Sequence, residues 1–445
     1  MRPTHSAGGS RDEDPRLSSA EAKRKTMAAN RDVVIVGGGV IGLSAAYYAA
    51  KKGHRVTLVE RGAPDHDSCS LGNAGLIVPS HFVPLAAPGM VALGLRWMLS
   101  RRSPFYIQPR LSRSLARWAY GFWRSSTREH VAMSAPLLRD LHLASRACFE
   151  ELAALPGADF GFEKKGLLAL CRTEAALREE AHTAEEARRL GLPAEVLDAR
   201  ATASLEPGVR MDVVGSVYYP KDCHLAPRLF VAWLTRACQD AGVRFEWRSE
   251  VVGWRTSGRR VAAACTSRAE LGADEFVICG GCWSPLVARG LGLRLPIEAG
   301  KGYSLTMPSP RKAPAISALL IEARVAVTPM AGALRFGGTM EIGGLNETIH
   351  PWRVEGIIQS AIRYLPDFTA ADFQGIEPWR GLRPCTPDGL PFLGRSQRHD
   401  NLVIATGHAM LGLSLGPITG KLVAQLISGE SPEIDLTLLR PERFD

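Results

Sequence analysis

The chain has 445 residues, of which 46% are hydrophobic and 22% charged, and this composition excludes a collagen-like or globally disordered protein. Lys and Arg exceed Asp and Glu by 54 to 45, so the formal net charge of +9 directs attention to anionic partners. Nine cysteines, an odd and scattered set, favour reduced thiols in a cytoplasmic protein over a disulfide framework. The length suits an enzyme of two domains.

The N-terminal segment differs in composition from the rest of the chain. It mixes basic, acidic and small polar residues and lacks the apolar segment of a secretory signal, so we expect residues 1–30 to be a disordered tail. Residues 68–95 form the longest uncharged run, but prolines and glycines interrupt it. Such a segment would leave backbone groups unpaired in lipid, so we predict no transmembrane helix.

A strand, a helix and a second strand follow the tail directly. Residues 32–36 are apolar and β-branched, as in a strand buried on both faces of a parallel sheet. Residues 40–50 form an alanine-rich helix that Gly53 ends, and residues 55–60 form the second strand. Because this order is that of a Rossmann-like unit, we predict an α/β fold.

Three glycines occupy the turn between the first strand and the helix. Gly37, Gly39 and Gly42 fit the pattern G-x-G-x-x-G, which permits a tight turn, close approach to a pyrophosphate, and close packing of helix on strand. Glu60 ends the second strand, where a carboxylate accepts hydrogen bonds from both ribose hydroxyls. We therefore predict a dinucleotide at the helix N-terminus, the alternative being a glycine turn in an unrelated α/β unit.

The loop after Glu60 bears on which dinucleotide binds. Residues 68–75 are small, polar and glycine-rich, so their backbone N–H groups can lie along an extended cofactor. An NAD enzyme more often continues directly into another helix and strand. The loop therefore favours FAD.

From about Arg31 to the C-terminus the chain resembles the FAD-dependent D-amino-acid oxidase superfamily and, within it, the bacterial D-amino-acid dehydrogenases. The resemblance rests on five ordered motifs: VVIVGGGVIG, SLGNAG followed by PLAAPG, GFEKKGLLAL, GLRPCTPDGLPFLG and ATGHAMLGLSLGP. By its stretch SPFYIQPR, the chain is similar to the branch of the family that acts on D-proline and cis-4-hydroxy-D-proline. The resemblance implies a Rossmann-like FAD-binding domain and a discontinuous substrate domain built on an antiparallel sheet.

The resemblance also implies non-covalent FAD and the residues that hold it. These are Gly37, Gly39, Val40, Ile41, Gly42, Glu60 and Arg61 around the nucleotide, Ser68, Asn73, Ala74 and Gly75 along the pyrophosphate and flavin, Val251 at the adenine, Gly280, Gly281 and Trp283 in a strand-end turn, and Gly407, His408, Gly412, Leu413 and Ser414 near the flavin.

The last of these groups also makes physical sense without the resemblance. It follows a strand at residues 401–405 and leads into a helix from Thr419 onward, and N–H groups at a helix entry stabilise negative charge on a reduced flavin. For His408 we favour a role in backbone positioning over one as a proton shuttle.

The sequence contains one C-x-x-C pair, Cys279 and Cys282, which elsewhere indicates a redox dithiol or half of a zinc site. No second pair with metal spacing accompanies it, so we predict no metal and interpret Cys279 as a small apolar residue in place of alanine. Cys385 lies in the flavin-proximal loop, where some relatives attach flavin covalently, but its position does not clearly coincide with theirs.

A second domain interrupts the first. Residues 173–190 form a solvated helix, and strand-like runs follow that suggest a large antiparallel sheet over the flavin; these are residues 215–219, 301–307, 316–328 and 334–338. We predict an FAD-binding domain from residues 31–86, 200–292 and 376–445, and a substrate domain from residues 87–199 and 293–375.

Oxidation of an amino acid requires a grip on its carboxylate and a Cα hydrogen aimed at flavin N5. Arg383 matches the family's carboxylate-binding arginine, the alternative being an ordinary loop salt bridge. Hydride transfer from a deprotonated amine needs no side-chain base. Tyr303, His81, Tyr219 and His224 are candidate pocket residues, although each residue type is more often a packing or turn residue.

A basic aromatic stretch covers residues 96–128, with no acidic residue between Asp67 and Glu129. Arginine with tryptophan suits an anionic membrane surface, and a partner dehydrogenase subunit is a second candidate. The alternative is a tryptophan core with a solvated arginine face. No nucleic-acid motif accompanies the stretch, so we expect no nucleic acid and a cytoplasmic protein, peripheral on the inner membrane face if the membrane hypothesis holds.

The leading hypothesis is an FAD-dependent D-amino-acid dehydrogenase that passes electrons to a quinone or another acceptor than oxygen. Its substrate is a small molecule, a D-amino or imino acid, with D-proline and cis-4-hydroxy-D-proline as cyclic candidates. Two alternatives stay open: a glycine or sarcosine type oxidase that uses oxygen, and a flavin-binding accessory subunit of a dehydrogenase complex.

Overall fold

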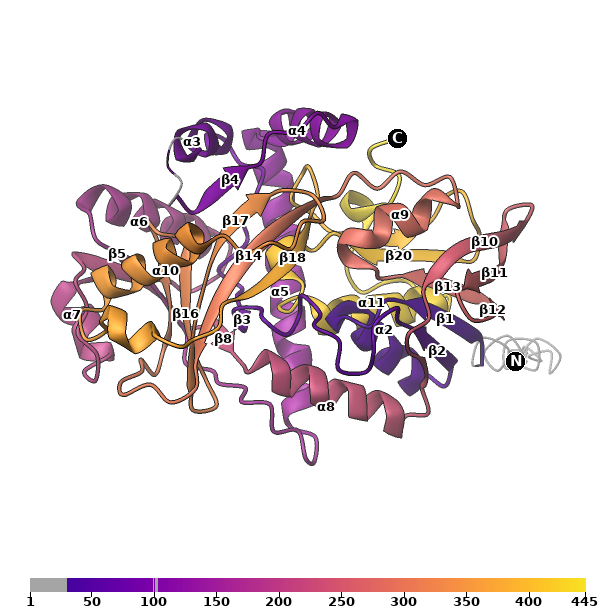
Figure 1. Ribbon diagram of the computed structural model, residues 1–445, viewed down its shortest axis with the longest axis horizontal. Helices are drawn as coiled ribbons and strands as arrows, with labels where there is room; N and C mark the ends of the chain where they lie inside the picture. Colours follow the sequence, from indigo (N-terminus) through magenta and orange to yellow (C-terminus); the bar gives the residue numbers. More distant parts are fainter. Residues whose placement is uncertain (1–29, 99, 101–102) are drawn as a thin grey trace, which may run out of the picture.

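The computed structural model describes residues 30–98, 100 and 103–445 (Figure 1). The predicted disordered tail therefore lies outside the described residues except for Asn30. Two large sheets stand side by side, with one long helix running between them (Figure 1).

The first sheet has the strand order β19-β20-β13-β1-β2-β9 and is parallel except for the antiparallel pair β19 and β20. Its strands are β1 (Asp32–Val36), β2 (Arg55–Val59), β9 (Arg244–Glu246), β13 (Glu275–Ile278), β19 (Phe392–Arg395) and β20 (Leu402–Thr406). The predicted strand, helix and strand are confirmed as β1, α2 (Val40–Lys51) and β2.

Helices cover this sheet and bury its central strands. On one side α2 packs against α8 (Pro227–Asp240) and α11 (Gly416–Ile427), and α11 in turn contacts the long helix α5 (Arg128–Ala153). Elsewhere α9 (Ser284–Arg289) contacts a three-stranded sheet of β10 (Val251–Ser257), β11 (Arg260–Thr266) and β12 (Glu270–Gly272). Helix α11 begins three residues before the predicted Thr419, because Pro417 is compatible with the first turn.

The second sheet has nine strands and forms the other half of the molecule (Figure 1). Its path is β18 (Trp379–Cys385), β14 (Glu298–Met307), β17 (Ala333–Ile342), β16 (Val325–Met330), β15 (Ser317–Leu320), β5 (Leu167–Cys171), β7 (Gly215–Tyr219) and β6 (Glu195–Asp198), with β4 (Phe105–Ile107) beside β17. It is mostly antiparallel, as predicted, but β15 pairs with β5 and β17 with β4 in parallel.

One predicted strand of this sheet is two strands. Residues 316–328 span the turn of a hairpin. Strands β15 and β16 pair antiparallel, and residues 321–324 make the turn between them. The run lacks glycine and proline at the turn, so the sequence pattern hid it.

The remaining helices lie on the faces and the rim of the second sheet. They are α6 (Glu174–Arg189), which matches the predicted helix and has Thr173 as its N-cap, α7 (Ala199–Leu205), α10 (Pro351–Tyr364), α3 (Met90–Trp97) and α4 (Arg113–Ser125). Helices α3 and α4 lie at the top of the view in Figure 1. A short pair, β3 (Leu76–Ile77) and β8 (Cys223–His224), lies near the centre, and 3-10 turns occupy Gly281–Trp283, Ala370–Phe373, Ala409–Leu411 and Thr437–Leu439.

The predicted domain boundaries stay a prediction. Strands β7 and β18, which fall in ranges predicted for the FAD-binding domain, pair in the nine-stranded sheet.

Candidate active site

The glycine turn after β1 is packed too tightly for any larger residue at two of its three positions. Gly37 has a left-handed φ of +113°, and a Cβ there would lie 2.6 Å from the carbonyl oxygen of Cys279. A Cβ on Gly42 would lie 1.9 Å from the carbonyl oxygen of Gly37. The third position is different, because a Cβ on Gly39 would meet only Ser70 Oγ, at 3.6 Å. The backbone at Gly39 is therefore open toward a ligand.

Polar groups gather around this turn. Glu60 Oε2 accepts a hydrogen bond from the Gly38 N–H at 2.7 Å, and its Oε1 accepts one from the Gly62 N–H at 2.8 Å. Ser70 Oγ accepts from the Val40 N–H at 3.0 Å at the start of α2. The carboxylate is thus fixed beside the turn, where a ribose would meet it.

A cavity of about 340 Å³ opens at this turn. Sixteen of the residues predicted to bind FAD line it: Gly37, Gly39, Val40, Ile41, Glu60, Arg61, Ser68, Asn73, Val251, Gly280, Gly281, Trp283, Gly407, His408, Gly412 and Leu413. The Arg61 guanidinium lies over the Trp283 ring, 3.8 Å from its centroid. Lining residues that the sequence did not single out include His66, Asp67, Ser70 and Ser249.

Four predicted cofactor residues lie elsewhere. Gly42 packs behind the turn, as its role in helix packing requires, and Gly75 has a φ of +77° and faces the Leu225 carbonyl. Ala74 and Ser414 line a second, larger cavity. There Ser414 Oγ accepts from the Val78 N–H at 3.1 Å and lies 3.0 Å from His142 Nδ1.

The larger cavity has a volume of about 710 Å³ and joins the first. Cys69, Asn73, Gly381 and Ala409 line both, so a long molecule can extend from the glycine turn into the larger cavity. This arrangement fits FAD, with the nucleotide at the turn and the flavin ring at the junction.

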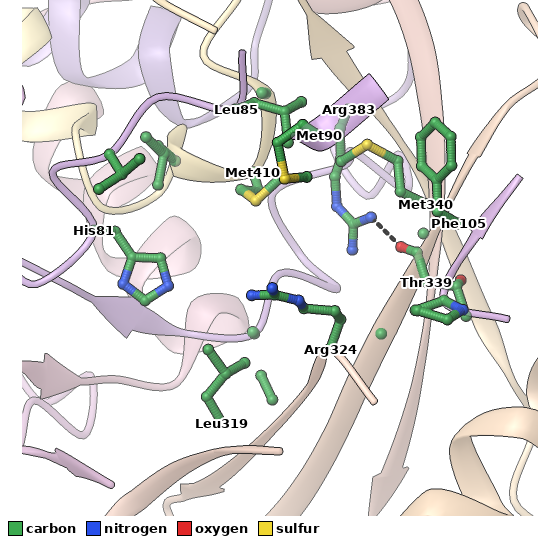
Figure 2. Close-up of a pocket in the computed structure, with 18 of the residues that line it drawn as sticks. His81, Leu85, Met90, Phe105, Leu319, Arg324, Thr339, Met340, Arg383 and Met410 are labelled. Carbon is green, nitrogen blue, oxygen red and sulfur yellow. Dashed lines mark hydrogen bonds between the residues drawn. The ribbon is translucent and has the colours of Figure 1, made fainter. Parts of the chain in front are cut away.

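Arg383 projects into the larger cavity from β18 (Figure 2). Its Nη1 donates to the Thr339 carbonyl, and its guanidinium lies against Gly302, where a Cβ would be 2.1 Å from Nη2. Among the residues that the structure describes, no carboxylate pairs with it, and burial lowers the pKa of the Arg383 guanidinium. A partly buried cation without a counter-ion is the arrangement expected where an anionic ligand binds.

The other candidate pocket residues differ in how available their polar atoms are. Tyr303 lines the cavity, but its hydroxyl donates to Glu341 Oε2 at 3.1 Å and its ring packs in the core of the nine-stranded sheet. His81 lines the cavity beside Ser80, whose Oγ donates to Asp222. Burial, with the charge of Arg324, lowers the pKa of His81 to about 4. Tyr219 lines the cavity, whereas His224 pairs with β3.

His408 and the cysteines have the surroundings of structural groups. His408 Nε2 lies 3.0 Å from Thr419 Oγ1, and burial lowers the pKa of His408 to about 3. All nine cysteines are free thiols. Cys279 and Cys282 are buried, the Cys282 thiol donates to the Leu382 carbonyl at 3.3 Å, and burial raises the pKa of both thiols. A hydrogen-bonded His408 fits backbone positioning.

Two further features of the cavity were missed from the sequence. Arg324 enters it from the turn between β15 and β16, and the misread turn concealed this residue (Figure 2). Helices α3 and α4 line its rim, with Trp118 Nε1 donating to the Cys385 carbonyl at 2.9 Å. The aromatic content of the basic stretch drew attention to α4, whereas most of α3 precedes that stretch.

Comparisons with known proteins agree with the geometry. A family model described as "FAD dependent oxidoreductase" matches residues 32–426. The chain is 33% identical to the D-amino acid dehydrogenase of Granulibacter bethesdensis over 420 residues, which are 93% of this chain and 99% of that protein. It is 35% identical to the D-amino acid dehydrogenase of Methylobacterium radiotolerans, over 92% of this chain and 99% of that one.

Among solved structures, glycine oxidase from Geobacillus kaustophilus superposes with a TM-score of 0.74 at 26% identity, covering 94% of this chain and 100% of that one. The chain belongs to the family of FAD-dependent oxidoreductases. Its cofactor is therefore FAD.

No helix in residues 30–98, 100 and 103–445 is long and apolar enough to cross a membrane. Within the same residues, no group of three or more His, Cys, Asp and Glu side chains could hold a metal ion.

Proposed function

We propose that the protein is a D-amino-acid dehydrogenase that oxidises the Cα–N bond of its substrate. The observation that carries this proposal is Arg383, a guanidinium in the larger cavity without a carboxylate partner among the described residues. The names of the relatives support the same reaction class.

Each residue of the cavity has a part in this reaction. The planar Arg383 guanidinium binds the substrate carboxylate through two parallel hydrogen bonds, and Gly302 leaves the space that its position requires. Leu85, Met90, Met340 and Met410 lie around the Arg383 guanidinium and give this part of the cavity an apolar lining (Figure 2). His81 stays neutral above pH values of about 4, so it adds no charge beside the substrate amine.

Bound FAD supplies the acceptor for two electrons and one hydrogen of the substrate. Gly37, Gly39, Glu60 and Arg61 would hold its nucleotide, and the shared lining at Asn73 and Gly381 would hold the flavin ring. The chain's contribution is orientation: a carboxylate fixed on Arg383 presents one face of Cα to that ring. We propose that FAD is attached non-covalently, so the FAD bound to the purified protein should exchange with FAD in solution.

Anaerobic bleaching of the flavin absorbance tests the function. The purified holoprotein is mixed with D-amino acids, their L-enantiomers, glycine, sarcosine, D-proline and cis-4-hydroxy-D-proline. We expect bleaching by D-amino acids and by the cyclic candidates. Bleaching by L-amino acids alone, or by none of the compounds, would reject the proposal.

The variant Arg383→Gln tests whether Arg383 binds the substrate carboxylate. Loss of a bidentate charged pair in a desolvated site is expected to lower kcat/KM about a thousandfold or more, with Arg383→Lys intermediate because it keeps the charge and loses the fork. FAD content measured on the same samples is the control, since Arg383 does not line the nucleotide cavity. An unchanged kcat/KM would mean that a residue other than Arg383 binds the substrate carboxylate.

A glycine or sarcosine type oxidase is the second candidate, which the similarity to glycine oxidase favours. Air admitted after bleaching separates the two. Fast re-oxidation indicates the oxidase, and slow re-oxidation with fast turnover through a quinone analogue indicates the dehydrogenase. An accessory flavin subunit would bind FAD and be bleached by no amino acid.

We further propose that helices α3 and α4 rest on an anionic membrane, where a lipid-dissolved quinone could accept the electrons. Both helices rim the larger cavity. Their region exposes large apolar side chains, Leu95, Leu111, Tyr120, Trp123 and Met133. Exposed arginines alternate with them: Arg96, Arg113, Arg117, Arg124 and Arg128. Arginine with exposed tryptophan complements lipid headgroups.

Vesicle sedimentation tests this surface. The holoprotein should bind vesicles rich in phosphatidylglycerol, bind phosphatidylcholine vesicles weakly, and lose binding in Trp123→Ser with Arg117→Gln or at high salt. Equal binding to both vesicle types, or binding to neither, would contradict the membrane proposal and favour a protein subunit as the partner of this surface.

A further inference from the structure

The larger cavity contains a second guanidinium besides Arg383. Figure 2 shows Arg324 and Arg383 both pointing into it, Arg324 from the turn between β15 and β16 and Arg383 from β18. Arg383 has the role of binding the substrate α-carboxylate under the function proposed above. Arg324 is left without an assigned task.

Arg324 has no carboxylate in ion-pair contact among the residues that the structure describes. Its guanidinium carbon lies 6.0 Å from the centroid of the Trp97 ring. Glu179 and Glu180 also line the cavity, and the charge of Arg324 acts on Glu180 from beyond ion-pair distance. Arg324 is exposed, and its guanidinium points into the cavity (Figure 2), where an anionic ligand group would complete its hydrogen bonds.

The backbone at Arg324 is unfavourable for arginine. Its φ is +53°, the left-handed region that glycine and asparagine adopt most readily at the end of such a turn. The Arg324 N–H donates to the Ile321 carbonyl at 3.3 Å, so the turn closes on itself. Because the turn holds a long side chain where a small residue would cost less, the side chain itself is the feature to explain.

The turn is also fixed in place, which a recognition element requires. Glu322 Oε1 accepts hydrogen bonds from Thr173 N and Thr173 Oγ1, both at 3.0 Å, at the start of α6. Its other oxygen accepts from the Tyr364 hydroxyl of α10. Arg324 is therefore presented by a turn clamped to two helices.

The space around Arg324 suits a substrate longer than a small neutral amino acid. The cavity of about 710 Å³ is lined near both guanidinium groups by apolar side chains such as Leu319, Met90 and Met410. Arg324 is exposed, so solvent screens a charged pair there in part, but a second carboxylate still gains a charge-assisted hydrogen bond that is stronger than that of an uncharged isostere.

We infer that Arg324 is a specificity-determining residue that binds a side-chain carboxylate, so that the protein prefers acidic D-amino acids such as D-glutamate over their neutral amides. This inference rests on the proposed function for the chemistry and adds the substrate class. Glu179 and Glu180 also line the cavity and repel a second carboxylate, so the inference requires the side-chain carboxylate to meet Arg324 rather than these two groups.

The test compares D-glutamate with D-glutamine, which differ in charge and hardly in shape. We expect wild-type holoprotein to favour D-glutamate in kcat/KM, and Arg324→Gln to lower the ratio of the two kcat/KM values about 10- to 100-fold. Arg324→Glu should reverse the preference toward D-lysine. Arg178→Gln is the matched control, because Arg178 is an exposed arginine of α6 outside the cavity lining and its loss changes the net charge equally.

A binding measurement separates this inference from the proposed function. Calorimetric titration with 2-oxoglutarate and 2-oxobutyrate, which cannot be oxidised at an amine, should show tighter binding of the dicarboxylate, and Arg324→Gln should abolish that difference. If no D-amino acid bleaches the flavin but the dicarboxylate preference depends on Arg324, the proposed function fails and the recognition of a second carboxylate stands. If D-amino acids bleach the flavin and Arg324→Gln changes D-glutamate and D-glutamine equally, the inference is overturned and the function stands.

Discussion

At the scale of single residues, the three glycines of the turn predict different consequences for the same substitution. Gly42→Ala places a Cβ 1.9 Å from the Gly37 carbonyl oxygen, so α2 must shift from β1. We expect a loss of stability of about 1–3 kcal/mol from overpacking, together with loss of FAD. Gly39→Ala places its Cβ 3.6 Å from Ser70 Oγ, so the apoprotein should keep its stability while FAD binding weakens.

Thermal unfolding of the apoproteins and titration with FAD measure the two effects separately. The pair serves as its own control, because both substitutions add one methyl group to the same turn. A Gly42→Ala apoprotein as stable as wild type, or a Gly39→Ala protein with unchanged FAD affinity, would contradict the division of roles.

The same residues show what the sequence could reveal at this scale. Gly37, Gly42 and Glu60 were predictable because each performs a local task within one strand-turn-helix unit. Arg324 was not, because the contacts that bring its turn to the cavity join segments far apart in the chain. Sequence spacing carries no signal for such contacts.

At the scale of elements, the packing of α2 on α11 depends on a second pair of glycines. A Cβ on Gly420 would lie 2.4 Å from the backbone carbon of Ser44, so Gly420→Ala must separate the two helices despite the better helix propensity of alanine. We expect the free energy of unfolding to fall by about 1–3 kcal/mol. Chemical denaturation measures the change.

Gly416→Ala is the control for this prediction, since its Cβ would meet the movable Val40 Cγ2 at 3.0 Å. It lies on the same helix and should cost less. Equal effects of the two substitutions would show that backbone contact between the helices is not what limits their approach.

Elements with a clear period or cap were predicted well, and those defined by tertiary pairing were not. The strand at β1, the helices α2 and α6, and the strand β7 follow from local patterns. The hairpin of β15 and β16 was missed, because its turn uses Arg324 at a φ of +53° where the pattern rules expect glycine. The parallel pairing of β5 with β15 joins residues that are distant in the sequence, such as Leu167 and Ser317, and has no local signature.

At the scale of the whole molecule, the buried histidines predict how stability depends on pH. Burial lowers the pKa of His142 to about 3, of His224 to about 4 and of His408 to about 3, while the unfolded chain binds these protons near the ordinary value of 6.5. Between these values the unfolded state holds more protons, so the free energy of unfolding falls as pH drops below about 6.5, by about 1.4 kcal/mol per unit for each histidine. Asp222 opposes this trend, since burial raises its pKa to about 7 and its contribution is lost as pH rises from about 4 to 7. With three histidines against one aspartate, the net slope remains positive.

Urea unfolding of the holoprotein at pH values from 5 to 7 should therefore show stability increasing with pH, and His408→Asn should reduce the slope by about one proton. Parallel curves for the two proteins would mean that His408 is protonated in the fold, and its hydrogen bond to Thr419 would then need another explanation.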